Sequence, residues 1–560
     1  GNNNDWTNNN MQESDISLDH PQNNFATLNS VVPNYIGTVT YSQGNLRAYA
    51  SVNSGYAEST LSITSGKYYT EMLYESGGGT LSNEGLGFTS TGGGSNSVAS
   101  GYSYRTNGTI YIDGTNSASV STYTTGDVVA MAIDADNGEV RFYKNGTLVY
   151  TDTGLSYPRY TPFVWNRASS AAASVVINFG QDSSFAGNKV AQGNTDENGF
   201  GDFYYEPPAG YLALCTQNLP DPAIADGSEH FNTVLYTGNG STQSITGVGF
   251  QPDFVWVKER SSTSSPNAYD SVRGATNYLY TDQTAAEATA SSTLQSFDTD
   301  GFSAGNAGGI NENSQTYAAW NWKADNTSGS SNTDGSITST VSANTTAGFS
   351  IVSYTGNGSA GATIGHGLSS APEMIITKNR DALTNWFTFV SELGAGNSLI
   401  LNTTNASYAA SILWNNTAPT ASVFSVGTAT ETNGSGNDII AYCFHSVEGY
   451  SKIGSFTGNG STDGTFVYTG FKPAFILWKR SSSTSNWLIW DNTRSPYNVV
   501  DDVVFPDLSN AESSSAASYG IDMLSNGFKL RNSNATVNGS GSTYIYMAFA
   551  EIPFKYSNAR

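Results

Sequence analysis

Charged residues are scarce in this chain. They make up 12% of its 560 residues, and the 46 acidic residues outnumber the 23 basic ones, so the net charge is −23. Nucleic-acid binding depends on clustered Lys and Arg that neutralise phosphates, so this balance argues against such a role. It also argues against adhesion to anionic membrane surfaces. The simplest interpretation of the acidity is solubility.

Cysteine and long apolar runs are also nearly absent. The two cysteines, Cys215 and Cys443, fall in different candidate domains, so a disulfide framework is not expected. No run of about twenty apolar residues occurs, which argues against a membrane-spanning helix. The chain begins at Gly1 without Met or a signal-peptide pattern, which is typical of a processed form or an excerpt.

Glycine, serine, threonine and asparagine are abundant instead. Gly and Asn accept positive φ and Thr suits a pleated surface, so this mixture favours short strands joined by tight turns. Hydrophobic residues account for 38% of the chain and aromatic residues for 12%, enough to build cores. At 560 residues the chain is too long for one core. We therefore predict an all-β protein of several domains.

A six-residue sequence occurs three times. Tyr-Thr-Gly-Asn-Gly-Ser at 236–241 recurs at 354–359 and, with Phe in place of Tyr, at 456–461. A proline follows each copy, and a lysine follows each proline after six residues: Pro252 and Lys258, Pro372 and Lys378, Pro473 and Lys479. Apolar strands are predicted after the prolines, at 254–257, 374–377 and 475–478, and aromatic strands at the repeat ends, at 317–322, 440–444 and 544–549. This spacing marks three tandem β-rich repeat domains.

The segments between these patterns complete the predicted organisation. Asn326 to Thr346 is dense in Ser, Thr, Gly and Asn and is predicted to be a flexible linker, whereas the last two repeats abut and are predicted to pack together. The predicted order is an N-terminal arm (1–30), a β-sandwich (31–200), a Pro-rich connector (201–228), β repeat 1 (229–325), the Ser/Thr/Gly linker (326–346), β repeat 2 (347–447) and β repeat 3 (448–560).

Two Asn-Gly turns lie in the predicted sandwich. Asp136-Asn137-Gly138 and Lys144-Asn145-Gly146 separate apolar stretches and predict hairpins. The stretches 126–134 and 141–146 resemble the central signature of SPRY domains, and 160–164 and 176–180 resemble the family's closing strands. The resemblance covers roughly residues 60–182. It implies a concanavalin-like sandwich of two antiparallel sheets that binds partners through loops at one rim, and it does not imply catalysis.

Other stretches resemble parts of tailed-phage virion proteins. The run 23–28 and the connector at 201–228 resemble segments that flank SPRY-like domains in those proteins. The ending at 546–556 resembles the end of an uncharacterised repeat family found in them. This resemblance suggests a setting for the protein without assigning an activity to the repeats.

The sequence carries no clear metal-binding pattern. The four histidines, His20, His230, His366 and His445, are dispersed, and no HExxH motif occurs. His366 has no counterpart in the other repeats, so we interpret it as a surface or loop residue. Asp134 and Asp136 faintly resemble a calcium loop, but the closing Glu is absent, so a hairpin turn is favoured. No metal or cofactor is expected.

Catalytic patterns are equally weak. No Gly-x-Ser-x-Gly elbow occurs, and neither cysteine has an activating local context. Glycan cleavage needs two acids about 5–10 Å apart, and sequence alone cannot pair the candidates, which are Glu71, Asp270, Glu287, Asp298 and Asp491.

Simpler structural roles explain several of these side chains. Asp270 with Arg273, and Asp491 with Arg494, are predicted to be structural ion pairs. The repeated lysines are candidates for a function, and the simpler prediction is that each ends a strand with its ammonium group in water and its stem over apolar surface.

Tryptophan offers a further candidate function. Sugar rings stack on exposed aromatic faces, and the tryptophans near predicted strand ends are Trp320, Trp322, Trp386, Trp487 and Trp490. Core packing is the favoured interpretation for each, so no sugar-binding platform and no specific binding residue is predicted.

These observations lead to a non-enzymatic hypothesis. The chain is interpreted as a virion structural protein of a tailed phage, a tail fibre or spike taking part in host-surface recognition and located outside cells. Expected partners are other virion proteins through the N-terminal arm, a host surface glycan or protein, and further copies of the chain, with a trimer as the working guess. No nucleic acid and no membrane insertion are expected. The alternatives are a capsid decoration or head-fibre protein, a glycan depolymerase of a tailspike and, more remotely, a secreted bacterial adhesin.

Overall fold

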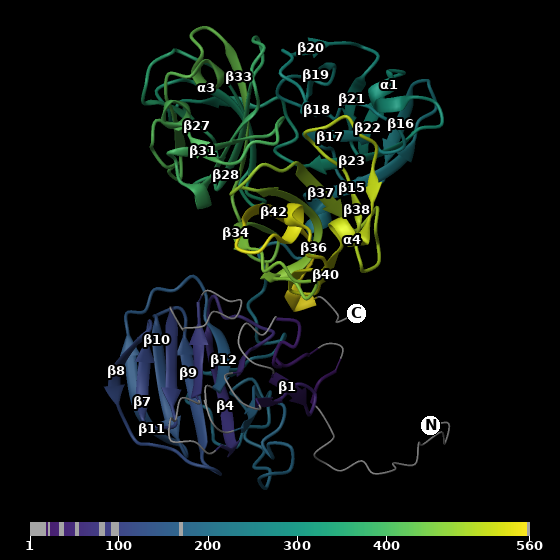
Figure 1. Cartoon of the computed structure of the whole chain (residues 1–560). Coiled ribbons are helices and arrows are strands. Elements are labelled where there is room, and N and C mark those ends of the chain that lie inside the picture. Colours follow the sequence, from purple (N-terminus) through teal and green to yellow (C-terminus); the bar gives the residue numbers. More distant parts are fainter. Residues whose placement is uncertain are drawn as a thin grey trace. The chain divides into compact units, whose positions relative to one another are not determined.

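Strands dominate the chain, which confirms the all-β fold class. A computed structural model describes residues 18–20, 23–32, 39–50, 55–77, 85–90, 100–166 and 172–556, apart from the side chains of 165 and 166. The chain divides into two compact units, residues 1–221 and 222–560 (Figure 1). No helix among the described residues is long and apolar enough to cross a membrane.

Unit 1 is a sandwich of two antiparallel sheets, as the sequence predicts. The first sheet runs in the order β1 (Val39–Ser42), β2 (Arg47–Ala50), β13 (Ala173–Asn178), β4 (Lys67–Ser76), β9 (Val128–Asp134), β10 (Glu139–Lys144) and β11 (Thr147–Thr153). The second runs in the order β3 (Gly55–Glu58), β12 (Thr161–Asn166), β5 (Gly85–Thr89), β6 (Gly101–Arg105), β7 (Thr109–Ile112) and β8 (Thr115–Ser119). Strand β9 lies in the middle of its sheet and is buried along its whole length, which explains its unbroken apolar sequence.

Both predicted hairpins are present. Strand β10 pairs with β9 on one side and with β11 on the other. Asn145 and Gly146 have φ values of 47° and 75°, the two positive values that a type I′ turn requires. Asp134 closes the other turn by accepting hydrogen bonds from the backbone and side chain of Asn137, at 3.0 and 2.9 Å. The stretch that resembles a calcium loop is therefore a hairpin turn.

Parts of the predicted arm and connector belong to the sandwich. Phe25 and Leu28 are buried, and Phe25 forms a β-bridge with Cys215. Strand β14 (Leu212–Ala213) adds to the first sheet by pairing in parallel with β4. Residues 1–17 of the arm, which were expected to contact other virion proteins, lie outside the described residues.

Unit 2 contains the three repeats, each built from a large and a small sheet. Repeat 1 has β15 (Phe231–Thr237), β23 (Thr316–Trp322), β17 (Phe254–Glu259), β18 (Asn267–Asp270), β19 (Asn277–Tyr280) and β20 (Ala288–Thr289), and the small sheet β16 (Gln243–Thr246), β22 (Gly301–Ala304) and β21 (Leu294–Asp298). Repeat 2 has β26 (Phe349–Thr355), β33 (Asp438–Phe444), β28 (Met374–Asn379), β29 (Phe387–Val390), β30 (Asn397–Ile400) and β31 (Tyr408–Ala409), and the small sheet β27 (Ala362–Gly365) and β32 (Val423–Val426). Repeat 3 has β34 (Ser451–Thr457), β42 (Thr543–Pro553), β36 (Phe471–Arg480) and β37 (Trp487–Asp491), the small sheet β35 (Phe466–Tyr468), β41 (Gly527–Leu530) and β40 (Ile521–Leu524), and the pair β38 (Asp502–Val503) and β39 (Ser513–Ser514).

Helices in unit 2 are limited to single turns. The α-helical turns are α1 (Gly308–Asn311), α2 (Ser411–Trp414), α3 (Thr430–Asn433), α4 (Ala516–Tyr519) and α5 (Ala535–Asn538), and the 3₁₀ turns are η2 (Gly227–Glu229), η3 (Ser391–Leu393) and η4 (Phe554–Tyr556). As shown below, three of these turns, α1, α3 and α5, hold the repeated Gly-Asn-Gly sequence in place.

The segment expected to be a flexible linker is ordered. Strands β24 (Ser330–Asn332) and β25 (Ser339–Asn344) extend the large sheet of repeat 2, because β25 pairs with β26 on one side and with β24 on the other. The linker prediction is therefore wrong. Ser, Thr and Asn in a strand with one solvent-facing side can be as polar as a linker, since only the other face of that strand needs apolar side chains.

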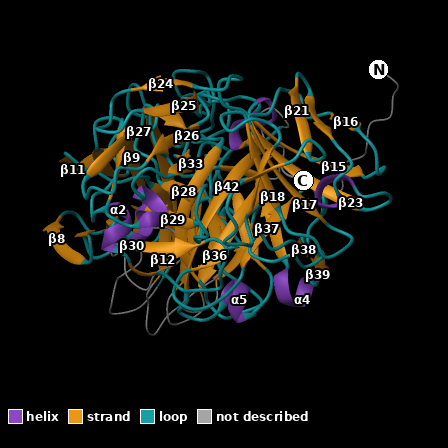
Figure 2. Cartoon of the chain, turned by 90° about the horizontal axis from the view of Figure 1, so that it is seen from above, coloured by secondary structure: helices purple, strands orange, loops and turns teal. Residues whose placement is uncertain are grey.

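The large sheets of the three repeats share one hydrophobic core. In β17, Val255 and Val257 face the core of repeat 1, whereas Phe254 and Trp256 face a cluster that also contains residues of repeats 2 and 3. Strands β28 and β36 divide their side chains between a private and a shared core in the same way. Seen from above, strands of the large sheets gather in the middle and the helical turns α2, α4 and α5 lie toward the outside (Figure 2).

Candidate functional site at the joints between the repeats

Each of the five candidate acids forms hydrogen bonds or ion pairs with other residues of the chain. Glu71 is buried and accepts hydrogen bonds from the backbone of Tyr204 and Tyr205, both at 2.8 Å, and burial raises its pKa to about 7. Asp298 accepts from Ser296 and Ser303 within its hairpin. The other three acids bond to arginines at the contacts between repeats, which we call joints.

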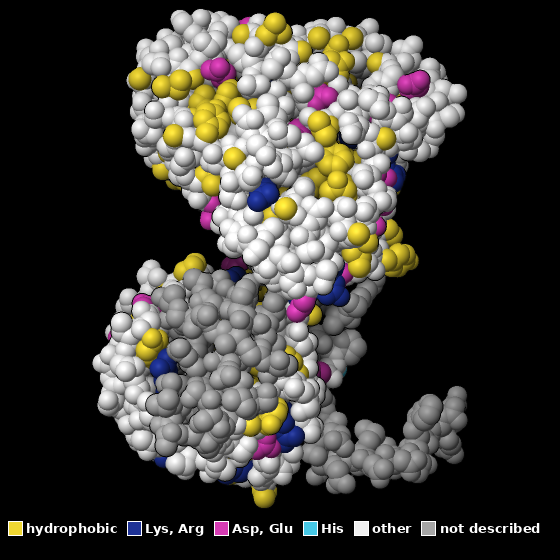
Figure 3. Space-filling model, viewed as in Figure 1, with side chains coloured by type: hydrophobic (Ala, Val, Ile, Leu, Met, Phe, Trp, Pro, Cys, Tyr) yellow, Lys and Arg dark blue, Asp and Glu magenta, His cyan; other side chains and the backbone are white. Residues whose placement is uncertain are grey.

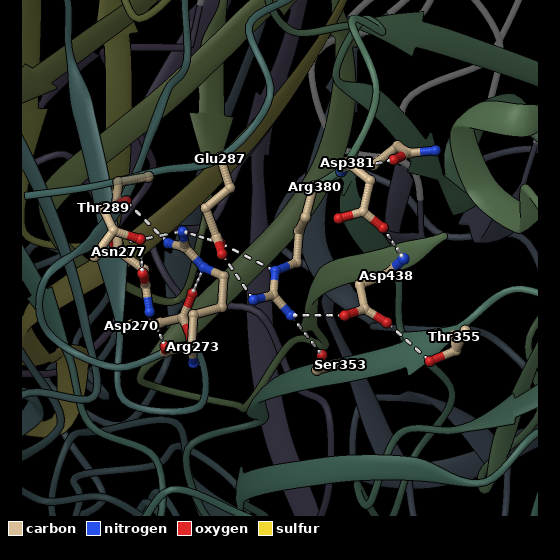
Figure 4. Close-up of polar contacts among 12 residues, drawn as sticks. Asp270, Arg273, Asn277, Glu287, Thr289, Ser353, Thr355, Arg380, Asp381 and Asp438 are labelled. Carbon is tan, nitrogen blue, oxygen red and sulfur yellow. Dashed lines mark hydrogen bonds and ion pairs between the residues drawn. The ribbon is translucent and has the colours of Figure 1, made fainter. Parts of the chain in front are cut away.

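The joint between repeats 1 and 2 contains a network of charged side chains, among them Asp270, Arg273, Glu287 and Arg380 (Figure 4). Asp270 and Arg273 form an ion pair of 2.5 Å with both side chains fully buried. Glu287 lies between two arginines, 3.0 Å from Arg273 and 2.7 Å from Arg380 of repeat 2. This network confirms the predicted ion pair and brings Asp270 and Glu287 together, but with a guanidinium between them.

The electrostatics of this network favour the charged form of Glu287. Burial acts to raise the pKa of Glu287, but the hydrogen bonds and charges of Arg380 and Arg273 outweigh it and lower the pKa. Tyr442 of repeat 2 donates to Asp270 at 2.7 Å, and burial raises the pKa of its hydroxyl well above the usual value. The network therefore joins repeats 1 and 2 through charge-assisted hydrogen bonds.

The joint between repeats 3 and 1 repeats this network. Asp491 and Arg494 form a buried ion pair of 2.6 Å, which confirms the second predicted pair. Glu512 bonds both to Arg494 at 2.9 Å and to Arg260 of repeat 1 at 2.8 Å. The position of Tyr442 is taken by Trp320, whose indole N–H donates to Asp491 at 3.0 Å.

The joint between repeats 2 and 3 has uncharged residues at the five positions of this network. Strand pairing aligns Val390 with Asp270 and Asp491, and Leu393 follows it at the spacing of the two arginines. Ser407 and Ser481 occupy the positions of the glutamate and of the arginine from the neighbouring repeat, because the Ser407 backbone donates to Ser481 as that of Glu287 donates to Arg380. Met547 replaces Tyr442 in the equivalent strand. All five positions thus change together.

The three repeated lysines lie inside the joints and not in water. Lys258, Lys378 and Lys479 have exposed fractions of 1%, 0% and 0%, so the prediction that their ammonium groups are solvated is wrong. Each donates to carbonyls of its own repeat and to one from a neighbouring repeat, which is Ser509 for Lys258, Thr284 for Lys378 and Thr404 for Lys479. Burial lowers the pKa of each lysine to about 8.

These lysine bonds run around the repeats in one direction. Repeat 1 bonds to repeat 3, repeat 2 to repeat 1, and repeat 3 to repeat 2. The repeats therefore form a closed ring with approximate threefold symmetry inside a single chain. We refer to its contacts as the 1–2, 2–3 and 3–1 joints.

A buried asparagine was missed in the sequence analysis of each repeat. The Gly-Asn-Gly turns are held by Asn311, Asn433 and Asn538, the last residues of α1, α3 and α5, which accept from the backbone of the turn asparagine at 2.9 Å in all three copies. Each also donates to a serine carbonyl in the turn. The signal was present, since each asparagine lies a few residues before the aromatic end strand.

His366 is buried, contrary to the predicted surface position. The Leu368 backbone donates to its Nδ1 at 3.1 Å, and its Nε2 lies 3.1 Å from the Thr420 carbonyl. It does lie in a loop, directly after β27. Within the described ranges, no group of three or more His, Cys, Asp and Glu side chains is arranged to hold a metal ion.

The candidate tryptophans are all core residues. Their exposed fractions do not exceed 1%, so none offers a face to a sugar. Trp320, Trp322, Trp386 and Trp487 belong to the shared core, and Trp490 belongs to the private core of repeat 3. The favoured interpretation from the sequence, core packing, is confirmed.

Comparison with known proteins gives one family match. A family model described as "Domain of unknown function (DUF7483)" matches residues 226–553, a range that includes all three repeats. No curated protein matches the chain.

Solved structures with similarity to this chain include two SPRY domains and a carbohydrate-binding module. The SPRY domain of human HERC1 is 19% identical, with 25% of this chain and 92% of that chain covered and a TM-score of 0.24. A second human SPRY domain is 16% identical, with 25% and 95% covered and a TM-score of 0.22. The carbohydrate-binding module CBM66 from Bacillus subtilis is 14% identical, with 27% and 91% covered and a TM-score of 0.20.

Proposed function

This chain belongs to the DUF7483 family through residues 226–553, and we propose that it is a non-enzymatic structural protein of a tailed-phage virion, part of a tail fibre or spike that takes part in host-surface recognition. The observation that carries the proposal is the role of the ionisable groups in unit 2. The repeated lysines and the acids Asp270, Glu287 and Asp491 join the repeats to one another. A body held together in this way presents loops on a rigid frame.

The surface of the chain supports recognition through uncharged contacts. On the face drawn in Figure 3, charged side chains are few and scattered, and most of the described surface is uncharged polar groups or backbone. Such a surface offers hydroxyl and amide groups for hydrogen bonds to a glycan or protein of the host. Several modules on one chain convert weak contacts into avidity.

The expected partners and location follow from this proposal. The chain would lie on the outside of the virion, with its N-terminal arm against other virion proteins and its modules toward the host. Assembly from several copies is part of the proposal, with a trimer as the simplest closed form of a fibre.

Labelling of virions tests the proposal. An antibody against the purified chain, detected with gold particles by electron microscopy, is expected to mark the tail fibres or spikes of the phage that encodes it. Marking of the capsid would favour the head-fibre alternative, and unmarked virions would refute a virion role.

A binding assay tests the absence of catalysis. The purified full chain is expected to bind host cells or their surface polysaccharide without releasing reducing ends. Release of reducing ends that Asp270→Asn or Asp491→Asn abolishes in a folded variant would establish the depolymerase alternative instead.

A further inference from the structure

The 3–1 joint closes the longest stretch of chain. Arg260 and Glu512 are 252 residues apart, whereas Arg380 and Glu287 at the 1–2 joint are 93 residues apart. Repeats 1 and 2 are connected by the paired segment 326–346, and repeats 2 and 3 by residues 445–450. No segment of the chain leads directly from repeat 3 to repeat 1, since repeat 2 lies between them in the sequence. Because closing a longer loop costs more entropy, the 3–1 joint depends most on its own contacts.

An accessible ion pair lies at the outer side of this joint. Arg260 donates twice to Glu512, from Nε at 2.9 Å and from an NH2 group at 2.8 Å, which is a bidentate geometry. The two side chains are 21% and 14% exposed, whereas the side chains of Arg494 and Asp491 deeper in the joint are fully buried. The Arg260–Glu512 pair is thus the part of the joint that can separate first.

Opening the joint would leave each repeat folded but incompletely covered. Every repeat has a private core between its own two sheets, as Val255, Ile375 and Ile476 illustrate. Opening would expose shared-core residues such as Trp320 of repeat 1 and Phe475 of repeat 3, whose rings lie 6.0 Å apart. A second opened copy exposes the same two faces. Repeat 3 of each copy can then cover repeat 1 of the other, so that both faces are buried in a pair of chains.

We propose that the 3–1 joint is a latch that opens without unfolding the repeats, and that an opened chain pairs through this joint with a second copy of itself. The partner surface is the one that each copy presents: repeat 3 of one chain against repeat 1 of the other. The charge pattern sets the order, because the glutamate left for Arg260 in an opened chain is Glu512 of repeat 3. The equivalent Glu287 of repeat 1 stays paired with Arg380 in the 1–2 joint, and the equivalent position in repeat 2 is Ser407.

Charge reversal across the latch tests this proposal. One full-length variant carries Arg260→Glu and a second carries Glu512→Arg, so each has like charges at its own latch. Mixed together, they form a pair of chains in which both latches have opposite charges. Light scattering is expected to give the mass of the unaltered protein for each variant and twice that mass for the mixture. The double variant Arg260→Glu/Glu512→Arg is expected to close again and to keep the mass of the unaltered protein.

The 1–2 joint provides a matched control. Arg380→Glu and Glu287→Arg variants, mixed in the same way, are expected to keep the mass of the unaltered protein, because the ordered segment 326–346 keeps these repeats together. Two results would overturn the proposal. One is a latch mixture that keeps the mass of the unaltered protein, and the other is loss of the folded repeats in either latch variant, seen as hydrogen exchange throughout β17 and β36.

Discussion

Three lysines of this chain are buried, although lysine side chains are usually exposed to water. In the joints, backbone carbonyls and not carboxylates accept hydrogen bonds from the ammonium groups of Lys258, Lys378 and Lys479. The pKa of each is lowered to about 8 by burial. Between that value and the unfolded value of 10.5, the unfolded chain binds more protons than the folded chain, so stability must rise with pH.

The lysines therefore predict an increase in stability between pH 7 and pH 9. Each is expected to add about 1 kcal/mol to the free energy of unfolding over this range. Denaturant unfolding at several pH values measures the slope, and Lys378→Met is expected to reduce it by that amount. Lys452→Met is the control, because Lys452 is exposed. Equal slopes in the wild type and Lys378→Met would contradict a buried ammonium.

Glu71 allows a second test at the residue scale. Its two oxygens accept one backbone N–H each from Tyr204 and Tyr205. Glu71→Gln retains only one acceptor oxygen, so one buried N–H loses its partner, at a cost of about 1–3 kcal/mol. Hydrogen exchange should show faster exchange of the Tyr204 and Tyr205 amides, and Glu197→Gln, an exposed substitution, should leave both unchanged. Unaltered exchange in Glu71→Gln would contradict this role.

Residue-scale interpretation from sequence succeeded where the partner was local. The pairs Asp270–Arg273 and Asp491–Arg494 are three residues apart, so their contact depends on one turn. It failed for Lys378, whose solvation depends on Thr284 of another repeat. No pattern around a lysine shows which repeat will cover it.

At the scale of elements, equivalent strands form joints with charged residues in one place and with uncharged residues in another. The five positions of the 1–2 joint, Asp270, Arg273, Glu287, Arg380 and Tyr442, correspond to Val390, Leu393, Ser407, Ser481 and Met547 of the 2–3 joint. Buried ion pairs add little stability compared with well-packed apolar residues, because removing charges from water is costly. The 2–3 joint is therefore a natural example of a joint without the ion-pair network.

Placing the residues of the 2–3 joint at the equivalent positions of the 1–2 joint tests what the charged network contributes to stability. The single change Arg273→Leu leaves Asp270 buried without its cation and is expected to cost about 3–5 kcal/mol. The complete set Asp270→Val, Arg273→Leu, Glu287→Ser, Arg380→Ser and Tyr442→Met is expected to lie within about 2 kcal/mol of the wild type. Denaturant unfolding of both variants measures the difference. A complete set as unstable as the single change would show that the network itself stabilises the joint.

Strand positions were largely predictable, and their partners were not. The strands after the prolines were found from short apolar runs such as Phe254–Val257, which became β17. An unbroken run of this kind indicates that both faces are covered. The same feature could have predicted a shared core, since one face of β17 packs within repeat 1 and the other against its neighbours. Strand β25 was missed because its polar sequence is also typical of a linker.

For the whole molecule, the closed ring explains why the family match includes all three repeats. Three copies of one sandwich are enough for every shared-core face to be covered. Sequence repetition predicted three domains, but it could not distinguish a linear array of separate domains from a closed ring, because both have the same strands and turns. The distinction lies in contacts between residues as distant as Trp320 and Asp491.

Removal of one repeat should therefore affect all of them. Residues 222–560 are expected to be more stable as the closed ring than as separate repeats, since the shared core links the three sandwiches. A fragment of residues 222–447 lacks repeat 3 and would expose faces that include Phe231 and Trp322, which pack against Phe475 in the intact ring. It is expected to bind an apolar dye and to associate in light scattering, because large exposed apolar patches favour association. Residues 1–221, a separate compact unit, provide the control and should remain a folded monomer. A monomeric 222–447 fragment with unchanged stability would mean that the repeats are independent domains and that the shared core contributes little.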